Sequence, residues 1–197
     1  MPIYHQGRKV KEVYHQGRKV KEIWHMGRRI YTSKPVEVMP TTPGLYDARD
    51  WLRATVQKYG LNYQTVTAFP FDIDSRNATT MAFMFEGCSA LTTVPQLDTS
   101  RVTNMAFMFE GCSALTTVPQ SDTSRVTNMA SMFNGCSALT TVPQMDTSKA
   151  TKMASMFNGC SALTDGNVSL TVKRKDADTF FMIRNSGLTR EPFITTE

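Results

Sequence analysis

The chain has 197 residues, of which 41% are hydrophobic and 10% aromatic, and its formal net charge is +5. This length predicts one or two domains, and this composition excludes an intrinsically disordered chain. No apolar run approaches the roughly 18 to 20 residues that span a membrane. The first residues, Met1 to Gln6, lack the apolar core of a secretory signal. We therefore expect a soluble protein that is not exported.

Positive charge is concentrated at the N-terminus. Residues 1–34 contain nine Lys or Arg and two Glu, which gives a net charge of +7. The remaining chain contains 13 Lys or Arg and 15 Asp or Glu, which gives −2. Such an asymmetry is typical of an attachment arm or of a patch that binds nucleic acid.

The basic segment is built from a ten-residue repeat. Residues 3–12 recur as residues 13–22 with one change, and more loosely as residues 23–32. Glycine accepts positive φ, so the repeat predicts strands of about eight residues joined by two-residue turns. A three-stranded meander is marginal alone, so we expect this arm (residues 1–34) to pair with other copies in a homo-oligomer such as a trimer. The expected turns are Gln6-Gly7, Gln16-Gly17 and Met26-Gly27.

A second repeat, 24 residues long, fills the middle of the chain. Residues 81–104 and 105–128 differ at one position, residues 129–152 are a third copy, and residues 153–164 are half of a fourth. Residues 74–80 are a degenerate unit end that marks the entry to the array. Each unit contains one Cys, and these are Cys88, Cys112, Cys136 and Cys160.

Each 24-residue unit predicts one coil of a stacked array. Asp98, Thr99 or Ser100 is suited to cap a helix, and Gly111 is suited to end it. Between them apolar residues recur every three or four positions, as on one helix face. Residues 115–119 predict a short extended segment, and stacking would bury equivalent residues as ladders. The apolar face comprises Val102, Met105, Met108, Phe109 and Cys112.

The repeat unit resembles the BspA-like leucine-rich repeats over residues 74–164. Its pattern is M-x-x-M-F-x-G-C-S-x-L-T-x-x-P-x-x-D-T-S-x-x-T. Those repeats occur in bacterial surface proteins, several of them adhesins, and in some phage proteins. The resemblance implies an α/β fold, namely a short leucine-rich-repeat solenoid of about four 24-residue coils preceded by the β-strand repeat arm. It implies binding or display and does not imply an enzyme.

Residues 35–73 precede the array and predict a linker with a helical entry cap, because terminal coils otherwise expose their cores. A helix is expected over residues 46–60. Leu45, Leu52 and Val56 would share its buried face.

Residues 165–197 follow the array and predict an exit cap. Residues 168–172 alternate apolar and polar side chains, as in a strand. Residues 180–183 are apolar and predict a short buried run.

The four Cys allow three interpretations. Zinc ligands converge, usually from closely spaced pairs, whereas one Cys per coil forms a line. An even count is compatible with disulfides between coils, but the absence of an export signal favours a reducing compartment. We therefore favour buried thiols that pack as small hydrophobic groups.

The sequence offers little for catalysis. Intertwined arms would gather His5, His15 and His25 as a metal site, but histidine tolerated in an amphipathic strand is the favoured interpretation. No Ser-His-Asp, phosphate-loop or HExxH signature occurs. The Asp series from Asp98 to Asp146 is better explained by capping. We expect no enzyme, no catalytic residue, no cofactor and no bound metal.

The basic arm has a second resemblance. The units Tyr4 to Val13 and Tyr14 to Ile23 resemble short tandem repeats at the N-termini of phage virion proteins, especially small tail or fibre proteins. Interleaved cations and aromatic rings also suit nucleic acid, although Glu12 and Glu22 interrupt the pattern. The candidate anchoring residues are Tyr4, Arg8, Lys9, Tyr14, Arg18, Lys19, Trp24 and Arg28.

Together these features predict a bacteriophage virion structural protein, assembled in the host cytoplasm without Sec export. The arm would join other virion proteins and its own copies, and the solenoid would bind a host-surface glycan or protein, at a tail tip or fibre. One alternative is a capsid decoration or head-fibre protein. Another is a nucleic-acid-binding protein that uses the arm; no membrane partner is expected.

Positions that vary between coils while the core stays fixed are candidate surface-binding residues. Stacked coils would present each set as a stripe, and drift at solvated positions is the alternative explanation. The candidates are Leu97, Ser121, Met145, Phe107, Glu86, Glu110, Asn134 and Asn158.

Overall fold

The computed structural model describes residues 34–168 and 177–189 in full, the backbone of residues 169 and 170, and the backbone of short strands between residues 3 and 32. In the arm, strands pair antiparallel within each repeat, in three separate two-stranded sheets. This differs from the predicted meander of eight-residue strands, because pairing within one repeat closes the shortest loops. The pairs are β1 (Ile3–His5) with β2 (Arg8–Val10), β3 (Tyr14–His15) with β4 (Arg18–Lys19), and β5 (Glu22–His25) with β6 (Arg28–Thr32).

The entry cap consists of two strands, β7 (Val36–Val38) and β8 (Asp72–Asp74), which pair in parallel. The helix α1 (Asp47–Lys58) lies between them in the sequence. The helix lies within the predicted residues 46–60, and two acidic residues in its first turn suit the positive end of its dipole. Leu52 and Val56 are fully buried, as expected. Leu45 is 45% exposed, so its predicted burial is wrong, because it lies in the turn before the helix.

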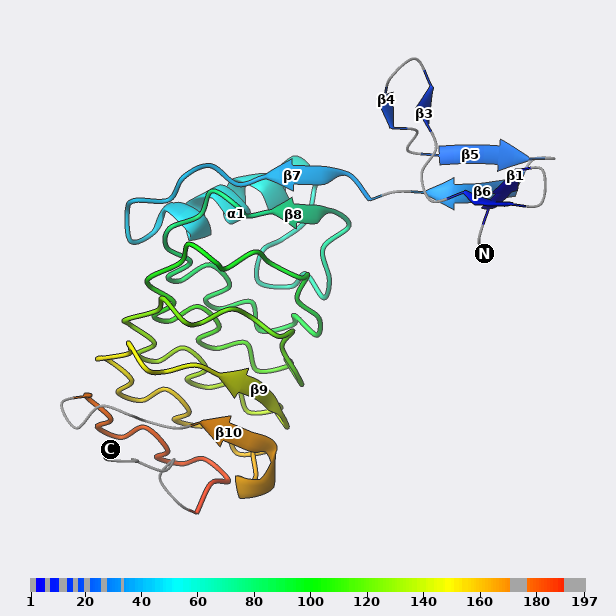
Figure 1. Cartoon of the computed structure of the whole chain (residues 1–197). Coiled ribbons are helices and arrows are strands. Elements are labelled where there is room, and N and C mark those ends of the chain that lie inside the picture. Colours follow the sequence, from blue (N-terminus) through cyan, green and yellow to red (C-terminus); the bar gives the residue numbers. More distant parts are fainter. Residues whose placement is uncertain are drawn as a thin grey trace.

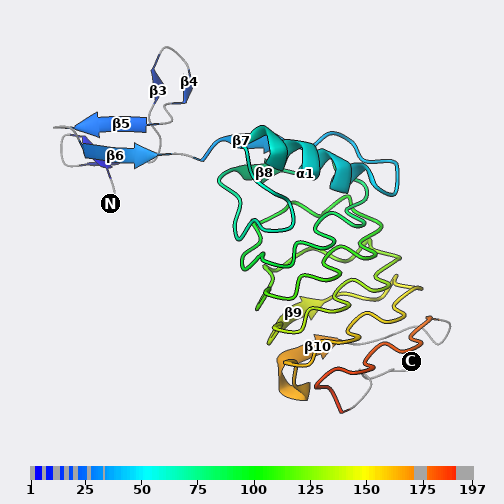
Figure 2. The ribbon, with the colours of Figure 1, turned by 180° about the vertical axis from the view of Figure 1, so that it is seen from behind.

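Residues 80–170 and 177–189 form a stack of coils, with α1, β7 and β8 at one end (Figures 1 and 2). Parallel bridges join equivalent residues of successive coils, from Thr80 to Asn104 and on to Asp178. The last step, from Lys152 to Asp178, is longer than 24 residues by two. We number the coils 1 (80–103), 2 (104–127), 3 (128–151), 4 (152–177) and 5 (178–189).

No α-helix occurs within the coils over the range that the structure describes, so the helix predicted in each unit is wrong. The Phe107 N–H donates to the Ala130 carbonyl of the next coil (2.9 Å) instead of to its own coil. Positive φ at Phe107 (60°) and Gly111 (72°) breaks the helical path. The same three- and four-residue spacing of apolar side chains therefore arises from successive tight turns.

The Asp residues close turns instead of capping helices. Asp98 Oδ1 accepts hydrogen bonds from the Ser100 N–H (3.0 Å) and from Ser100 Oγ (2.7 Å). Asp122 repeats both contacts with Ser124. This is the local turn that Asp favours, so the series has a structural role.

A row of backbone hydrogen bonds runs between each pair of coils. Four N–H groups of coil 2 donate to four carbonyls of coil 3, at 2.8–2.9 Å. We call these donors the N–H row of a coil and these acceptors the carbonyl row. The donors in coil 2 are Met105, Phe107, Phe109 and Gly111, and the acceptors in coil 3 are Asn128, Ala130, Met132 and Asn134.

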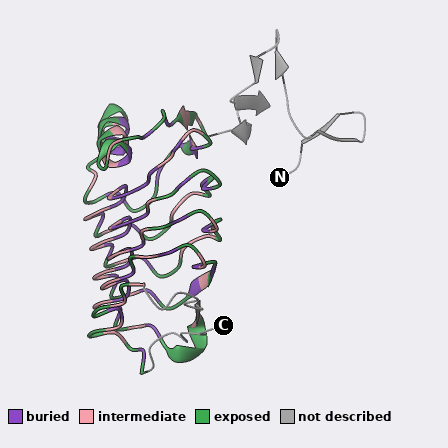
Figure 3. Ribbon diagram, turned by 60° about the vertical axis from the view of Figure 1, so that its left-hand side comes forward, coloured by how far each residue is buried: buried purple, intermediate pink, exposed green. Residues whose placement is uncertain are grey.

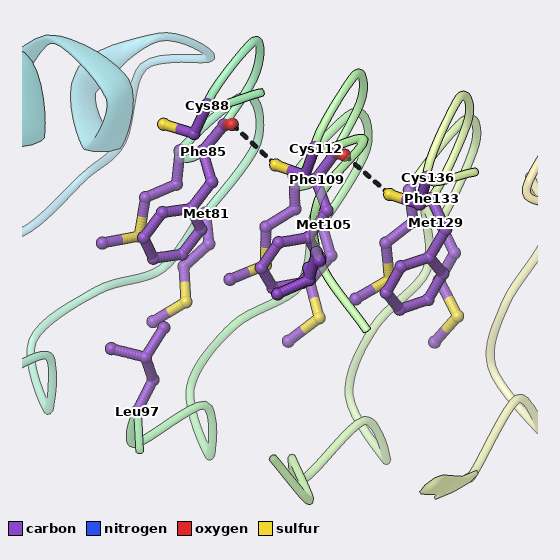
Figure 4. Packing of buried hydrophobic residues seen from close by; sticks show 14 of the residues in the cluster. Met81, Phe85, Cys88, Leu97, Met105, Phe109, Cys112, Met129, Phe133 and Cys136 are labelled. Atoms are coloured by element: carbon purple, nitrogen blue, oxygen red, sulfur yellow. Dashed lines mark hydrogen bonds between the residues drawn. The ribbon is translucent and has the colours of Figure 1, made fainter. Parts of the chain in front are cut away.

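Buried residues recur at equivalent positions of successive coils (Figure 3). Phe85, Phe109, Phe133 and Phe157 stack with ring centroids 5.3–5.7 Å apart and planes within 6° of parallel. The methionines at the unit starts lie beside them, as the close view shows for Met81, Met105 and Met129 (Figure 4). Each coil thus completes the core of its neighbours.

The cysteines form a ladder of buried thiols, all free, which confirms the favoured interpretation. Cys112 Sγ donates to the Phe85 carbonyl (3.1 Å) and Cys136 Sγ donates to the Phe109 carbonyl (3.0 Å; Figure 4). Burial raises the pKa of Cys88 and of Cys160 to about 12, and raises the pKa of Cys112 and Cys136 still further. The thiols stay protonated donors and are poor nucleophiles.

The stack extends past residue 164, where the sequence predicts the exit cap to begin. Strand β10 (Val168–Leu170), which follows the 3-10 turn η1 (Asp165–Asn167), pairs in parallel with β9 (Val142–Met145). Residues 178–189 then form coil 5. Phe180 and Phe181 are 67% and 47% exposed, so their predicted burial is wrong, whereas Met182 of the same run is buried, as expected.

The entry cap also seals coil 1. Thr42 Oγ1 donates to the Thr80 carbonyl and Tyr63 OH donates to the Met84 carbonyl, both at 2.6 Å. These carbonyls are equivalent to acceptors in the carbonyl rows of later coils.

Among the residues that the structure describes, no helix has the length and apolar character of a bilayer span.

The buried thiols predict a stability that falls at high pH. Above pH 9, thiols of the unfolded chain release protons, whereas those of the folded chain keep them up to pH 12 or beyond. The free energy of unfolding should therefore fall by about 1.4 kcal/mol per pH unit for each thiol. Denaturant titrations between pH 8 and 11 measure this slope. The variant Cys160→Ala should have a shallower slope, and an equal slope would contradict the assignment.

Candidate functional site

Three aromatic rings lie in a row along one edge of the entry cap and the first two coils, with the first ring tilted and the other two stacked. The ring of Tyr46, the residue before α1, lies 4.8 Å from that of Phe83 in coil 1. The ring of Phe83 lies 4.6 Å from that of Phe107 in coil 2, with the planes 8° apart. Tyr46 is exposed and both Phe are half-buried, so the rings present a surface to solvent.

The two Phe occupy a strained backbone position. Every coil places a residue other than glycine there, with φ between 54° and 60°. A left-handed conformation costs a residue with a Cβ roughly 1–2 kcal/mol, and bulky residues are rare in it. Phe is therefore kept against a local cost, which indicates a use for the ring. The residues are Phe83, Phe107, Ser131, Ser155 and Phe181.

A row of carboxylates and amides runs beside the rings, three residues further along each coil. Asn134 Nδ2 donates to Glu110 Oε1 (2.9 Å), and Asn158 Nδ2 donates to Asn134 Oδ1 (3.2 Å). Burial raises the pKa of Glu110. The hydrogen bond from Asn134 opposes this increase, and the negative charge of Glu86 adds to it. A cation near Glu86 and Glu110 would relieve this electrostatic cost.

The chain already places one cation on this surface. The guanidinium of Arg49, in α1, lies 4.3 Å from the Tyr46 ring centroid, and its Nη1 lies 3.4 Å from Glu86 Oε2. An aromatic face and a carboxylate together attract a guanidinium or an ammonium. We call Tyr46, Phe83, Phe107, Glu86 and Glu110 the aromatic–acidic strip.

The structure separates the predicted surface-binding residues into two groups. One group lies at the aromatic–acidic strip or continues its row of carboxylates and amides. Its members are Phe107, Glu86, Glu110, Asn134 and Asn158. Leu97 and Met145 are only 6% and 7% exposed, so they are wrong as surface contacts; they face the apolar interior that their neighbours Val94 and Pro143 also line. Half-buried Ser121 takes the equivalent place in the intervening coil, beside a cavity of about 20 Å³.

Sequence comparison of the coils missed part of this surface. Phe83 holds the same repeat position as Phe107 and was identifiable from it. Tyr46 and Arg49 lie outside the repeats, and no sequence pattern links them to the strip. The side chains of the candidate anchoring residues and of the three His lie outside the described residues. Within the described ranges, no group of three or more His, Cys, Asp or Glu is placed to hold a metal ion.

The Ser121 cavity predicts a stabilising substitution. Ser121→Leu restores the apolar residue that coil 1 has at this position, so the free energy of unfolding should rise by about 0.5–2 kcal/mol. Chemical denaturation measures the change. Thr116→Leu, at an exposed site in the same coil, should stay within about 0.5 kcal/mol of the parent. A loss of stability in Ser121→Leu would show that the side chain faces solvent.

Comparison with known proteins gives one family. No curated protein and no solved structure matches the chain significantly. The model of a family described as Mycoplasma protein of unknown function, DUF285, matches residues 79–190, which include all five coils. This family is related to the BspA-like repeat proteins. Because the match spans more than half of the sequence, the chain belongs to the DUF285 family.

Proposed function

We propose that this protein is a display protein, in which the arm (residues 1–34) is the anchor and the coil stack is a leucine-rich-repeat solenoid that binds a ligand. The observation that carries this proposal is the aromatic–acidic strip. Two Phe stay in left-handed conformations beside two carboxylates, one of which is partly desolvated. The relation of the family to BspA-like repeats supports a binding role over catalysis.

The strip favours a ligand with exposed cationic groups. Arg49 supplies the precedent, because it stacks on Tyr46 and pairs with Glu86. Phe107 and Glu110 repeat the same combination one coil further, where Glu110 accepts a hydrogen bond from the neutral Asn134. A host-surface protein that presents Arg or Lys fits this combination better than a neutral glycan.

The proposal places the protein in a bacteriophage virion, at a tail tip or fibre, with capsid decoration as the alternative. Its support is the resemblance of the arm repeats to N-terminal repeats of phage virion proteins. Each repeat pairs its own backbone into a short hairpin, and a hairpin leaves outer edges to which other chains can add.

The ligand-binding role predicts the effect of exchanging coil sequences. The double variant Phe107→Ser, Glu110→Asn gives coil 2 the residues that coil 3 has, so the fold should be retained. Its affinity for an octa-arginine peptide, measured by calorimetry, should fall about five- to thirtyfold, from loss of one cation–π contact and one ion pair. The reciprocal variant Ser131→Phe, Asn134→Glu should bind at least as tightly as the parent. Equal affinities with the same thermal stability would refute the role of the strip.

The anchoring role predicts the effect of removing the arm. Deletion of residues 1–33 should leave the melting temperature of the coil stack unchanged, because the core formed by the described residues lies entirely beyond residue 34. The shortened chain should fail to sediment with phage particles that carry the full chain. Separate analysis of purified tails and heads distinguishes the two placements. Incorporation at the normal level would contradict the anchor.

A further inference from the structure

The two ends of the coil stack differ in their backbone hydrogen bonding. Coil 4 donates from its N–H row to coil 5 at 2.7–2.9 Å, as every earlier coil does to its successor. In coil 5 the equivalent N–H groups have no acceptor among the residues that the structure describes. At the entry end Thr42 and Tyr63 donate to two of the four equivalent carbonyls of coil 1, whereas at the exit end none of the four donors is paired within the described residues. The open donors are Thr179, Phe181, Ile183 and Asn185.

A shallow groove of about 610 Å³ follows this open edge, lined by residues 177–184. Phe180 and Phe181 are exposed at the groove, and their ring centroids lie 3.9 Å apart. The guanidinium of Arg184 lies 4.7 Å from the centroid of the Phe181 ring. The edge therefore combines backbone donors, an apolar pair and one cation.

The edge resembles the entry cap in its chemistry. The cap meets coil 1 with an aromatic ring and an Arg: the Tyr46 ring contacts the Phe83 ring at a tilt of 46°, and Arg49 pairs with Glu86. Coil 5 carries Phe181 at the ring position and Arg184 at the carboxylate position. The matching surface is a coil with Phe and Glu at these two positions, as in coils 1 and 2.

Another copy of this chain does not supply that surface. Two exit ends placed together would face donors with donors, which cannot form hydrogen bonds. An exit end placed on an entry end meets α1, β7 and β8, whose core includes the fully buried Leu52 and Phe71. The N–H row of coil 5 could therefore reach the carbonyl row of coil 1 only if this cap moved away from it.

We propose that the open edge of coil 5 binds a partner chain that presents an uncapped coil of the same repeat, with Phe and Glu at the strip positions. The carbonyl row of the partner coil would accept from Thr179, Phe181, Ile183 and Asn185. Its Phe would stack on Phe181, as Phe107 stacks on Phe83, and its Glu would pair with Arg184. This site is independent of the aromatic–acidic strip and of the virion placement.

Two segments of the chain provide matched probes. Synthetic peptides of residues 104–117 and 128–141 differ only at the strip positions, with Phe107 and Glu110 in the first and Ser131 and Asn134 in the second. Each is added to the full chain, and amide hydrogen exchange is followed at the four open donors. The peptide 104–117 should slow exchange of these amides at least tenfold and bind at least fivefold more tightly than 128–141.

The variant Arg184→Asn, which has the residue that coil 4 carries at Asn158, should remove the preference between the two peptides without changing the melting temperature. No protection at saturating 104–117, or equal binding of both peptides to the parent, would overturn the proposal. Slow exchange of the four amides in the free chain would also overturn it, since the edge would then be covered already. Protection that appears only at high concentration of the free chain would assign the edge to a second copy instead.

Discussion

The row of backbone hydrogen bonds between coils is the constraint on which the rest of the structure depends. Each row fixes the next coil in register, so identical side chains must stack on one another. Stacked Phe rings and buried thiols follow from that register, with the thiols of coils 2, 3 and 4 each donating to a carbonyl of the coil before. A polar ladder and an apolar ladder therefore stabilise the same interface, and neither forms in a single isolated coil.

The same constraint accounts for both surfaces to which we assign binding. Coils held in register place Phe83 over Phe107 and Glu86 near Glu110, which concentrates aromatic surface and negative charge on one edge. The row must also end somewhere. At the entry the hydroxyl groups of Thr42 and Tyr63 donate to two carbonyls of coil 1, whereas at the exit the donors of coil 5 have no acceptor in the described part of the chain. The regular structure departs from its lowest free energy at two places. These are the left-handed backbone of Phe83 and Phe107 and the unpaired donors of coil 5.

The repeat period carries most of what the sequence predicts about the fold. A period of 24 residues specifies which side chains stack, and burial of Phe85, Cys112 and Met129 follows from it. The spacing within a unit is ambiguous, because tight turns and a helix both bring residues three and four apart to one side; hydrogen bonding to the next coil decides between them. Variation between coils identified Phe107 and Glu110 but also the buried Leu97, since a ladder can vary inside as well as outside. Tyr46 and Arg49 were unpredictable, because only the fold brings the cap against coil 1.

The register itself is tested most directly by cross-linking between coils. Thr117 and Thr141 are exposed, lie 24 residues apart and have hydroxyl oxygens 3.3 Å apart. A Thr117→Cys, Thr141→Cys variant should form a disulfide under mild oxidation, since this spacing suits disulfide geometry and the native thiols are buried. Thr93→Cys, Thr141→Cys places the two cysteines two coils apart and should stay reduced. Equal cross-linking of the two variants, or none in the first, would contradict the stacked arrangement.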